Sequence, residues 1–344
     1  MQPVRLGRNQ PPRFYRGGPS IAEFRGVPSS GDSVPEDWVG STTTLFGEAS
    51  LGLSRLDDGG LLRDAITADP VAWLGPGHTQ RFGADPALLV KLLDAGERLP
   101  VHCHPDDEFA RRHLGCPFGK TEAWIIVGTA VDDSSVYLGF TEDVEPARIS
   151  EWVMRQETSR ILDALHRIEV TPGDSVLVPA GIPHAIGSGV FMVELEEPTD
   201  LTVLLEWEGF GVDGNRDGHL RLGYELALSC VDRSGWGSER LAELRRTRGA
   251  GRPVRAGVEL ALPPAADPYF RAHRVRPDRA VWLEPSYAIL VVVAGSGTLT
   301  TDGGGDLELS RGDTVLIPYG AGEATLRGSV EAVRCLPPAV EQVR

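Results

Sequence analysis

Short apolar runs separated by glycine, proline and acidic residues recur along the chain, a pattern typical of buried β-strands joined by tight turns. One such unit occurs twice: residues 171–181 read TPGDSVLVPAG and residues 310–320 read SRGDTVLIPYG. In each copy Gly-Asp suits a turn, the apolar run suits a buried strand, and the proline and glycine that follow suit its end. The repeat predicts a mainly β fold with two jelly-roll β-barrels.

The two copies differ in what precedes them. Gly128 lies 45 residues before Gly173, whereas Gly295 lies 17 residues before Gly312. The first unit therefore contains an insertion, and residues 141–168 carry apolar positions at helical intervals, which predicts a helical insertion there. Residues 61–75 predict one further helix. We expect an N-terminal barrel over residues 1–213, a helical connector and linker over 214–252, and a C-terminal barrel over 253–344.

Candidate metal ligands lie in three segments of the first unit. His102 and His104 are two apart in a predicted strand, so both imidazoles project to one face while Cys103 points away. Glu122 and His184 lie at the edges of two other predicted strands. Three nitrogens and a carboxylate match the ligands of Zn²⁺, and they would also suit Fe²⁺, Mn²⁺, Co²⁺ or Ni²⁺.

The second unit lacks this ligand set. Aligning the repeats places Glu323 opposite His184, and residues 256–344 contain one histidine, His273. We therefore expect a C-terminal barrel without a metal site, with a structural or interface role.

Composition and charge narrow the function classes. A formal net charge of −15 argues against nucleic acid or an anionic membrane as a partner. The N-terminus lacks the apolar stretch of a signal peptide and no apolar run reaches membrane-spanning length, so we predict a cytoplasmic protein. The four cysteines show no CxxC spacing, which favours free thiols. The oligomeric state is left open.

Lysine is concentrated beside the candidate metal ligands. Of 34 basic residues only Lys91 and Lys120 are lysines, in LLVKLLDAG and GKTEAW. A compact ammonium group can bind an anion or, if desolvated, exchange a proton. This distribution predicts a functional role first for Lys120 and then for Lys91.

Several segments resemble the type I phosphomannose isomerases, two-cupin zinc enzymes that interconvert mannose 6-phosphate and fructose 6-phosphate. They are LLVKLLDAGERLPVHCHPDDEFA, GKTEAW, VPAGIPHAI and SRGDTVLIP. The resemblance implies two cupin barrels, a sugar-phosphate substrate and one divalent metal, with Zn²⁺ first among the candidates. It implies His104, Glu122 and His184 as ligands, and His102 where the family usually has glutamine. Lys120 matches the active-site lysine of the KTE motif.

The chain departs from the family pattern at the substrate site. Pro100 stands where the family usually has serine, whose hydroxyl proline cannot replace. In LLEWEGFGVDGNR, Glu206 suits the family's acidic position, but the position of the catalytic arginine is occupied by Gly209. Arg216 or Arg221 could substitute from a shifted loop, and Arg216 is the candidate that we adopt.

The resemblance implies a metal-dependent aldose–ketose isomerase that acts through a cis-enediol. In this hypothesis Lys120 supplies positive charge or transfers a proton, and Lys91 and Lys120 bind the substrate. Glu206 is the candidate acid/base, with Glu194 and Glu196 as competitors.

Three alternatives stay open. Pro100 and Gly209 favour a metal-dependent cupin enzyme acting on a different sugar or sugar phosphate. The chain could instead be a non-catalytic carbohydrate-binding or regulatory cupin that keeps the metal for stability. Dioxygenase chemistry at non-haem iron is allowed by the ligand set alone.

Overall fold

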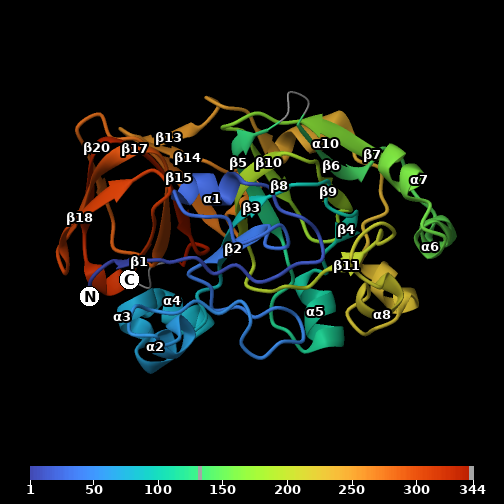
Figure 1. Ribbon diagram of the computed structural model, residues 1–344, viewed down its shortest axis with the longest axis horizontal. Coiled ribbons are helices and arrows are strands. Elements are labelled where there is room, and N and C mark those ends of the chain that lie inside the picture. The colour runs from blue at the N-terminus through green and yellow to red at the C-terminus, as the bar shows by residue number, and fades with distance from the viewer. Residues whose placement is uncertain (131–133, 341–344) are drawn as a thin grey trace.

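The computed structural model describes residues 1–130 and 134–340, which form two lobes built on antiparallel sheets (Figure 1). The N-terminal lobe holds two sheets. The six-stranded sheet runs in the order β12 (Arg245–Arg246), β8 (Ser175–Val178), β5 (Glu122–Thr129), β10 (Val190–Glu196), β3 (Leu89–Asp94) and β2 (Glu36–Val39). The five-stranded sheet runs in the order β11 (Val203–Leu204), β4 (His102–Cys103), β9 (His184–Ile186), β6 (Ser135–Phe140) and β7 (Leu165–Glu169).

The C-terminal lobe holds a single nine-stranded sheet. Its main path is β1 (Val4–Arg5), β19 (Thr314–Ile317), β17 (Ala288–Thr301), β20 (Ala324–Leu336), β15 (Arg271–Val275), β14 (Val258–Leu260) and β13 (Arg252–Arg255). The strands β16 (Ala280–Leu283) and β18 (Gly305–Ser310) pair with β20 and β17. The first strand of the chain thus belongs to the C-terminal sheet, where Val4 is the register partner of Leu316.

The repeated sequence unit forms the same local structure in both lobes. Its two copies give β8 and β19, each entered through a glycine with positive φ, 101° at Gly173 and 94° at Gly312. Gly173 N–H donates to Ile126 O (2.8 Å), and Gly312 N–H donates to Val292 O (2.9 Å). The predicted mainly β, two-cupin class is confirmed, although the sheets are cupin-like and do not close into complete barrels.

Residues 61–75 form two helices, so the prediction of one helix there is wrong. The helices are α2 (Leu62–Ala68) and α3 (Pro70–Leu74). Pro70 has no N–H with which to continue α2, and the side chain of Asp69 accepts from Ala72 N–H (3.1 Å) to cap α3.

Helices also occupy the predicted insertion and connector. The insertion contains α6 (Pro146–Met154) and α7 (Thr158–Asp163). The connector is a series of short helices: α8 (Gly214–Asp217), α9 (Tyr224–Ala227), η1 (Leu228–Cys230) and α10 (Ser238–Glu243). The remaining helices are α1 (Ser20–Arg25), α4 (Pro76–Phe82), α5 (Asp107–Leu114), η2 (Pro264–Ala266) and η3 (Tyr319–Ala321). The domain boundaries at residues 213 and 253 stay a prediction.

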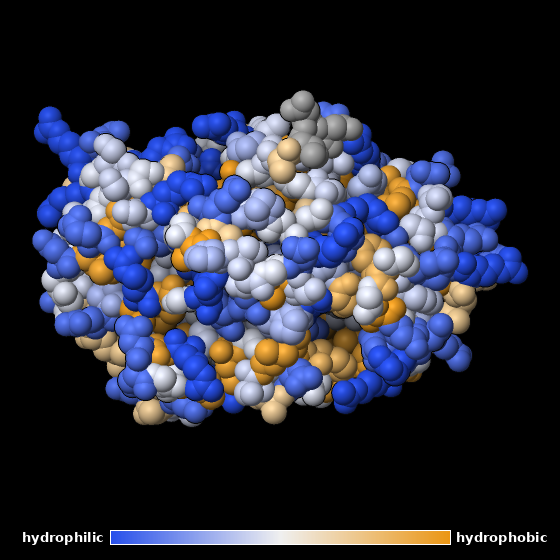
Figure 2. Space-filling view, viewed as in Figure 1, coloured by the Kyte–Doolittle hydropathy of each residue, from blue (hydrophilic) through white to orange (hydrophobic). Residues whose placement is uncertain are grey.

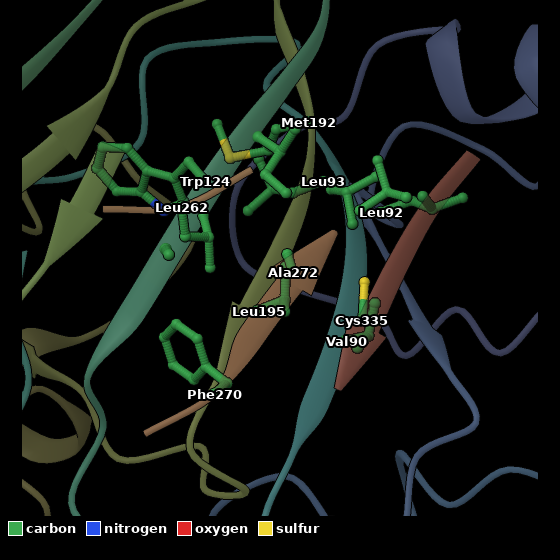
Figure 3. Packing of buried hydrophobic residues seen from close by; sticks show 14 of the residues in the cluster. Val90, Leu92, Leu93, Trp124, Met192, Leu195, Leu262, Phe270, Ala272 and Cys335 are labelled. Atoms are coloured by element: carbon green, nitrogen blue, oxygen red, sulfur yellow. The ribbon is translucent and has the colours of Figure 1, made fainter. Parts of the chain in front are cut away.

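The two lobes share one hydrophobic core (Figure 3). Strands β3, β5 and β10 of the first lobe pack against β15, β20 and the segments beside them in the second. The residues labelled in Figure 3 are Val90, Leu92, Leu93, Trp124, Met192 and Leu195 from the first lobe, and Leu262, Phe270, Ala272 and Cys335 from the second. Alternation and register put Val90, Leu92 and Leu195 on one face of the six-stranded sheet, and Trp124 on the other face with Glu122 and Glu194, to which its Nε1 donates.

The face of the molecule in Figure 2 is largely hydrophilic, with hydrophobic residues in smaller, separated patches. Across residues 1–130 and 134–340, no helix combines the length and the apolar character needed to cross a bilayer. The cytoplasmic location and the absence of nucleic-acid and membrane partners stay predictions.

Candidate metal centre

Three imidazoles converge between the two sheets of the N-terminal lobe. His102 lies in β4 and His104 directly follows that strand, and the register partner of His102 on β9 is His184. Their ring centroids lie 4.2 to 5.0 Å apart, and one nitrogen of each ring lies within 4.8 Å of the others. Cys103 lies between these two histidines in the sequence and contacts Cys230, with 3.8 Å between the Sγ atoms. The strand alternation therefore places the histidines as the sequence predicts.

The carboxylate comes from the opposite sheet. Glu122 is the first residue of β5, and its Oε2 lies 3.0 Å from His104 Nε2. Its Oε1 lies 3.2 Å from His184 Nε2. Two sheets thus contribute to one cluster, in which all four side chains are at most 9% exposed.

Backbone carbonyls orient the three rings. Nδ1 of His102 lies 2.8 Å from Pro100 O, and Nδ1 of His184 lies 2.8 Å from Ile182 O. Nδ1 of His104 lies 2.7 Å from Leu201 O. Because a carbonyl oxygen only accepts, each Nδ1 carries the proton and each Nε2 presents a lone pair to the centre. This is the tautomer that binds a metal through Nε2.

The electrostatics of the cluster also favour a bound cation. Burial lowers the pKa of His102, and burial followed by the charge of Lys120 lowers the pKa of His104 to about 3, so both rings are neutral at pH 7. Burial opposes ionisation of Glu122, but the charge of Lys120 acts in the opposite direction, and the pKa of this carboxyl lies well below its usual value.

Lone pairs without a donor mark the centre of the cluster. Within the described part of the chain, His184 Nε2 is buried and has no hydrogen-bond partner. It faces Glu122 Oε1 at 3.2 Å, and His104 Nε2 faces Glu122 Oε2 at 3.0 Å, so acceptor atoms lie opposite acceptor atoms and a divalent cation between them would compensate their desolvation. The residues therefore fit one metal ion with three nitrogen ligands and one oxygen ligand.

Both lysines of the chain lie beside this centre, held by carboxylates. Lys120 Nζ lies 3.1 Å from Glu122, 2.9 Å from Glu196 and 3.2 Å from His104 Nε2. Lys91 Nζ lies 2.8 Å from Glu196 and also contacts Glu36 and Glu194, at 3.6 and 3.8 Å. Burial disfavours both ammonium groups, but these carboxylates outweigh it and raise the pKa of each lysine. Both lysines are therefore cations at neutral pH.

A small inner cavity opens from the centre into a larger outer cleft. The inner cavity is lined by His102, Glu122, both lysines and Glu194, among others, and its volume of about 30 Å³ holds roughly two water molecules. The outer cleft has a volume of about 580 Å³. Both are lined by Arg13, Phe14, Thr202 and Leu204, which form the passage between them. A ligand in the outer cleft would therefore direct one end towards the metal ligands.

Two of the predicted catalytic residues lie outside the inner cavity. The carboxylate of Glu206 accepts from both terminal nitrogens of Arg98 (2.5 and 2.6 Å) and from Val101 N–H (2.9 Å). Arg216 lines the outer cleft, where its Nη2 lies 2.7 Å from Asp217. Gly209 has a φ of 90°, and a side chain added there would meet open space. The catalytic roles of Glu206 and Arg216 stay predictions.

Sequence reasoning missed the wall that the N-terminal segment contributes. Arg13, Tyr15 and Glu36 line the inner cavity. Glu36 accepts from the Tyr15 hydroxyl and from Trp38 Nε1, the latter at 2.6 Å. A sequence pattern could have identified Glu36: it lies two residues before Trp38, so an acid and a tryptophan share one face of a strand.

Glu194 emerges as a buried carboxyl that faces the reaction space. It lines the inner cavity and accepts from Trp124 Nε1 (3.1 Å). Burial and the nearby charge of Glu122 raise its pKa well above the usual value, even though Lys91 acts in the opposite direction. A carboxyl with a raised pKa accepts a proton more readily than an ordinary carboxyl, which suits an acid/base group.

Sequence comparisons point to one family. Residues 268–337 match the family model described as mannose-6-phosphate isomerase, cupin domain. The chain is 29% identical over 252 residues to mannose-6-phosphate isomerase ManA of Bacillus subtilis (strain 168), covering 72% of this chain and 73% of that protein. It is 30% identical over 250 residues to the probable mannose-6-phosphate isomerase GmuF of the same organism, covering 71% of this chain and 73% of that protein.

Solved structures agree on the fold. The mannose 6-phosphate isomerase from Bacillus subtilis matches 97% of this chain and 99% of its own, with a TM-score of 0.75 and 21% identity. A putative mannosephosphate isomerase from Archaeoglobus fulgidus matches 98% of this chain and 99% of its own, with a TM-score of 0.74 and 20% identity. At these identities the likeness establishes a shared two-lobed fold.

Proposed function

The chain belongs to the mannose-6-phosphate isomerase family, and from that premise we propose that it interconverts mannose 6-phosphate and fructose 6-phosphate with one bound Zn²⁺. The observation that carries the proposal is the convergence of three histidine Nε2 atoms, the Glu122 carboxylate and the Lys120 ammonium on one cavity. This arrangement combines a fitting metal site with a fixed cation at the closed end of a sugar-sized cleft.

The site contains a chemical group for each step of an aldose–ketose isomerisation. A divalent metal held by His102, His104, Glu122 and His184 would supply Lewis acidity towards a sugar oxygen. The reaction moves a proton between C2 and C1 while negative charge develops on the oxygens of the enediol. Lys120, a cation at the wall of the cavity, donates a hydrogen bond to that charge.

We assign the proton transfer between the two carbons to Glu194. Its carboxylate would take the proton from C2, and the resulting acid would return it to C1, while the hydroxyl proton on O2 passes to O1. C2 then carries the carbonyl, and the enzyme is unchanged after each turnover. Glu194 lines the inner cavity, whereas Glu206 is held by Arg98 outside it. Glu206 then orients Arg98 and the backbone at Val101, close to the ligand strand β4.

One residue favours a second candidate, an isomerase of the same type with a different sugar substrate. Pro100 lines the inner cavity where the family resemblance places serine, and its ring offers no hydrogen-bond donor to a sugar hydroxyl. A substrate with a different arrangement of hydroxyls would suit this wall.

The decisive experiment combines metal analysis with a substrate panel. Purified protein is expected to contain one divalent metal per chain and to turn over mannose 6-phosphate faster than other hexose phosphates and free hexoses. In D₂O, transfer through an enediol introduces solvent deuterium into the product. Absence of turnover of every hexose phosphate by metal-replete protein would overturn the proposal, and faster turnover of another sugar would select the second candidate.

A variant of the lysine tests its proposed role. Lys120→Arg keeps the positive charge but replaces the compact ammonium by a planar fork that cannot reproduce contacts with Glu122, Glu196 and His104. We expect kcat to fall roughly 100-fold or more, with metal content unchanged. Full activity of Lys120→Arg would exclude a role specific to lysine.

A further inference from the structure

Two cysteine thiols are in contact beside the metal centre, and the proposed function uses neither. Sγ of Cys103 lies 3.8 Å from Sγ of Cys230. Both are free thiols, and among the described residues the sulfurs of Cys116 and Cys335 make no comparable contact with another sulfur. Because a disulfide joins sulfurs about 2.05 Å apart, Cys103 and Cys230 need an approach of about 1.8 Å to become covalently bonded.

Cys103 occupies a position from which a displacement reaches the metal ligands. It lies between His102 and His104 in the sequence, and its side chain is fully buried. Its strand, β4, pairs with β11 on one side and with β9 on the other, where His184 is the register partner of His102. A shift of Cys103 therefore displaces two histidine ligands directly and disturbs the pairing that positions the third.

Cys230 is the last residue of η1, and the connector that carries it is hydrogen-bonded to the backbone beside the ligands. Asp232 N–H donates to Gly181 O (2.7 Å), and Gly181 N–H donates to His104 O (2.7 Å). Gly181 permits this close approach, since a Cβ at that position would lie 3.0 Å from Cys230 O. The connector therefore cannot move towards β4 without disturbing the backbone at His104.

The two thiols differ in their access to solvent. Cys230 is partly exposed, whereas Cys103 is buried. A small disulfide in solution therefore reacts first with Cys230, whose sulfur loses its proton, forms a mixed disulfide and releases one small thiol. The Cys103 sulfur, already in contact, then loses its proton, attacks the Cys230 sulfur and releases the second small thiol. Two protein thiols are oxidised in this way, and one small disulfide is reduced.

We propose that Cys103 and Cys230 are a redox-sensitive pair whose disulfide weakens metal binding at the adjacent centre. The inference rests on the metal site of the proposed function and not on the identity of the sugar. Distances between a metal and its ligands vary by only about 0.2 Å, whereas closing the disulfide changes the distance between the sulfurs by several times as much. Because the coupling is reciprocal, bound metal disfavours the disulfide by the same factor.

The test measures metal binding, so it does not depend on turnover. Protein is oxidised with glutathione disulfide or kept reduced, freed of the reagent, and titrated with Zn²⁺ against a chelator. Peptide mass mapping identifies the disulfide between Cys103 and Cys230 by the loss of two hydrogens. We expect the oxidised protein to bind Zn²⁺ at least roughly 10-fold more weakly. Reciprocally, saturating Zn²⁺ should raise the reduction potential of the pair by about 30 mV for each 10-fold difference.

Serine variants provide the matched comparison. Cys230→Ser cannot form the disulfide, so its Zn²⁺ affinity should be the same after both treatments, and Cys230→Ala serves the same purpose without a hydroxyl. Cys116→Ser removes a partly exposed thiol outside the pair and should keep the redox dependence of the unaltered protein. Thermal unfolding checks that every variant is folded.

Three results would overturn the proposal. They are an oxidised protein in which Cys103 and Cys230 stay thiols, a disulfide that leaves Zn²⁺ affinity unchanged, and an equal loss of affinity on oxidation of Cys230→Ser. Redox-dependent Zn²⁺ binding in a protein that isomerises no hexose phosphate would overturn only the isomerase, and an active isomerase with redox-independent Zn²⁺ binding would overturn only the redox-sensitive pair.

Discussion

The ammonium nitrogen of Lys91 lies 2.8 Å from Oε1 of Glu196, in a fully buried shell that also contains the carboxylates of Glu36 and Glu194. The ring of Trp38 covers this ammonium, with its centre 4.8 Å from Nζ. Lys91 therefore neutralises the acidic wall of the site. The contact of Lys91 with the substrate stays a prediction. Stability and kinetic measurements can distinguish a role in substrate binding from a role in neutralising the carboxylates.

Lys91→Met should destabilise the protein by roughly 3–5 kcal/mol, because it leaves buried carboxylates without their counter-ion. Urea unfolding of metal-loaded protein measures this change. The double variant Lys91→Met, Glu196→Gln should recover part of the loss, because it also removes one of the unpaired charges. Unchanged stability combined with a raised KM would instead show that Lys91 serves the substrate.

His102→Gln and His104→Gln should differ in metal binding. The family resemblance places glutamine at the position of His102, so an amide oxygen there should still complete the site, with metal affinity weakened by roughly 10-fold. His104 faces both Glu122 and Lys120, and its loss should weaken affinity by at least roughly 100-fold. Competition with a chelator measures both affinities, and equal losses would contradict the assignment.

Glu194→Gln and Glu206→Gln test which carboxyl transfers the proton. We expect Glu194→Gln to lower kcat by at least roughly 100-fold with little change in stability, because an amide cannot accept the proton. Glu206→Gln weakens a charged pair with Arg98 and should lower the free energy of unfolding by roughly 1–3 kcal/mol. Steady-state kinetics and denaturant unfolding separate the two effects. The reverse pattern would support the role predicted for Glu206 from the sequence.

The carboxyl of Glu197 should make stability depend on pH. Burial raises its pKa to about 8 from an ordinary value of 4.5, although the hydrogen bond from Thr121 N–H opposes this shift. Between these values the folded protein binds more protons than the unfolded chain, so this group's contribution is full below pH 4.5 and is lost as the pH rises through 8.

Glu197→Gln provides the comparison that isolates this group. Relative to the variant, the unaltered protein should lose roughly 2–4 kcal/mol of unfolding free energy between pH 5 and pH 8. Urea unfolding at both pH values measures the difference. Parallel pH dependence in the two proteins would show that Glu197 does not titrate in this range.

Local patterns in the sequence were sufficient for the metal centre and the repeated strand unit. Strand alternation places His102 and His104 on one face, and the Gly-Asp turns dock in the same way in both lobes. The break before Pro70 also had a local signal, the Asp-Pro pair, which outweighs the helical period around it.

Other features depend on which strands pair with one another, and no local pattern in the sequence specifies that pairing. Lys91 on β3 meets Glu36 because β3 pairs with β2, and it meets Glu194 and Glu196 because β3 also pairs with β10. The position of Arg221 depends on a left-handed backbone at Leu220 and at Arg221 itself, with φ values of 52° and 64°. Residues other than glycine rarely adopt this conformation. For such residues the sequence predicts a charge but not its partners.

The pairing of β1 with β19 sets an order of events during synthesis. A ribosome delivers Val4 about 310 residues before its partner Leu316, which at typical elongation rates is roughly 15–60 s. His184, the last metal ligand, emerges well before β19. β1 stays without its sheet partner until β19 arrives, whereas Asn9 and Arg13 already hydrogen-bond to Trp38 and Ser33 of the first lobe. A nascent chain can thus bring its metal ligands together before its first strand is paired, and the C-terminal lobe, whose described residues form no group that could hold a metal, completes the fold.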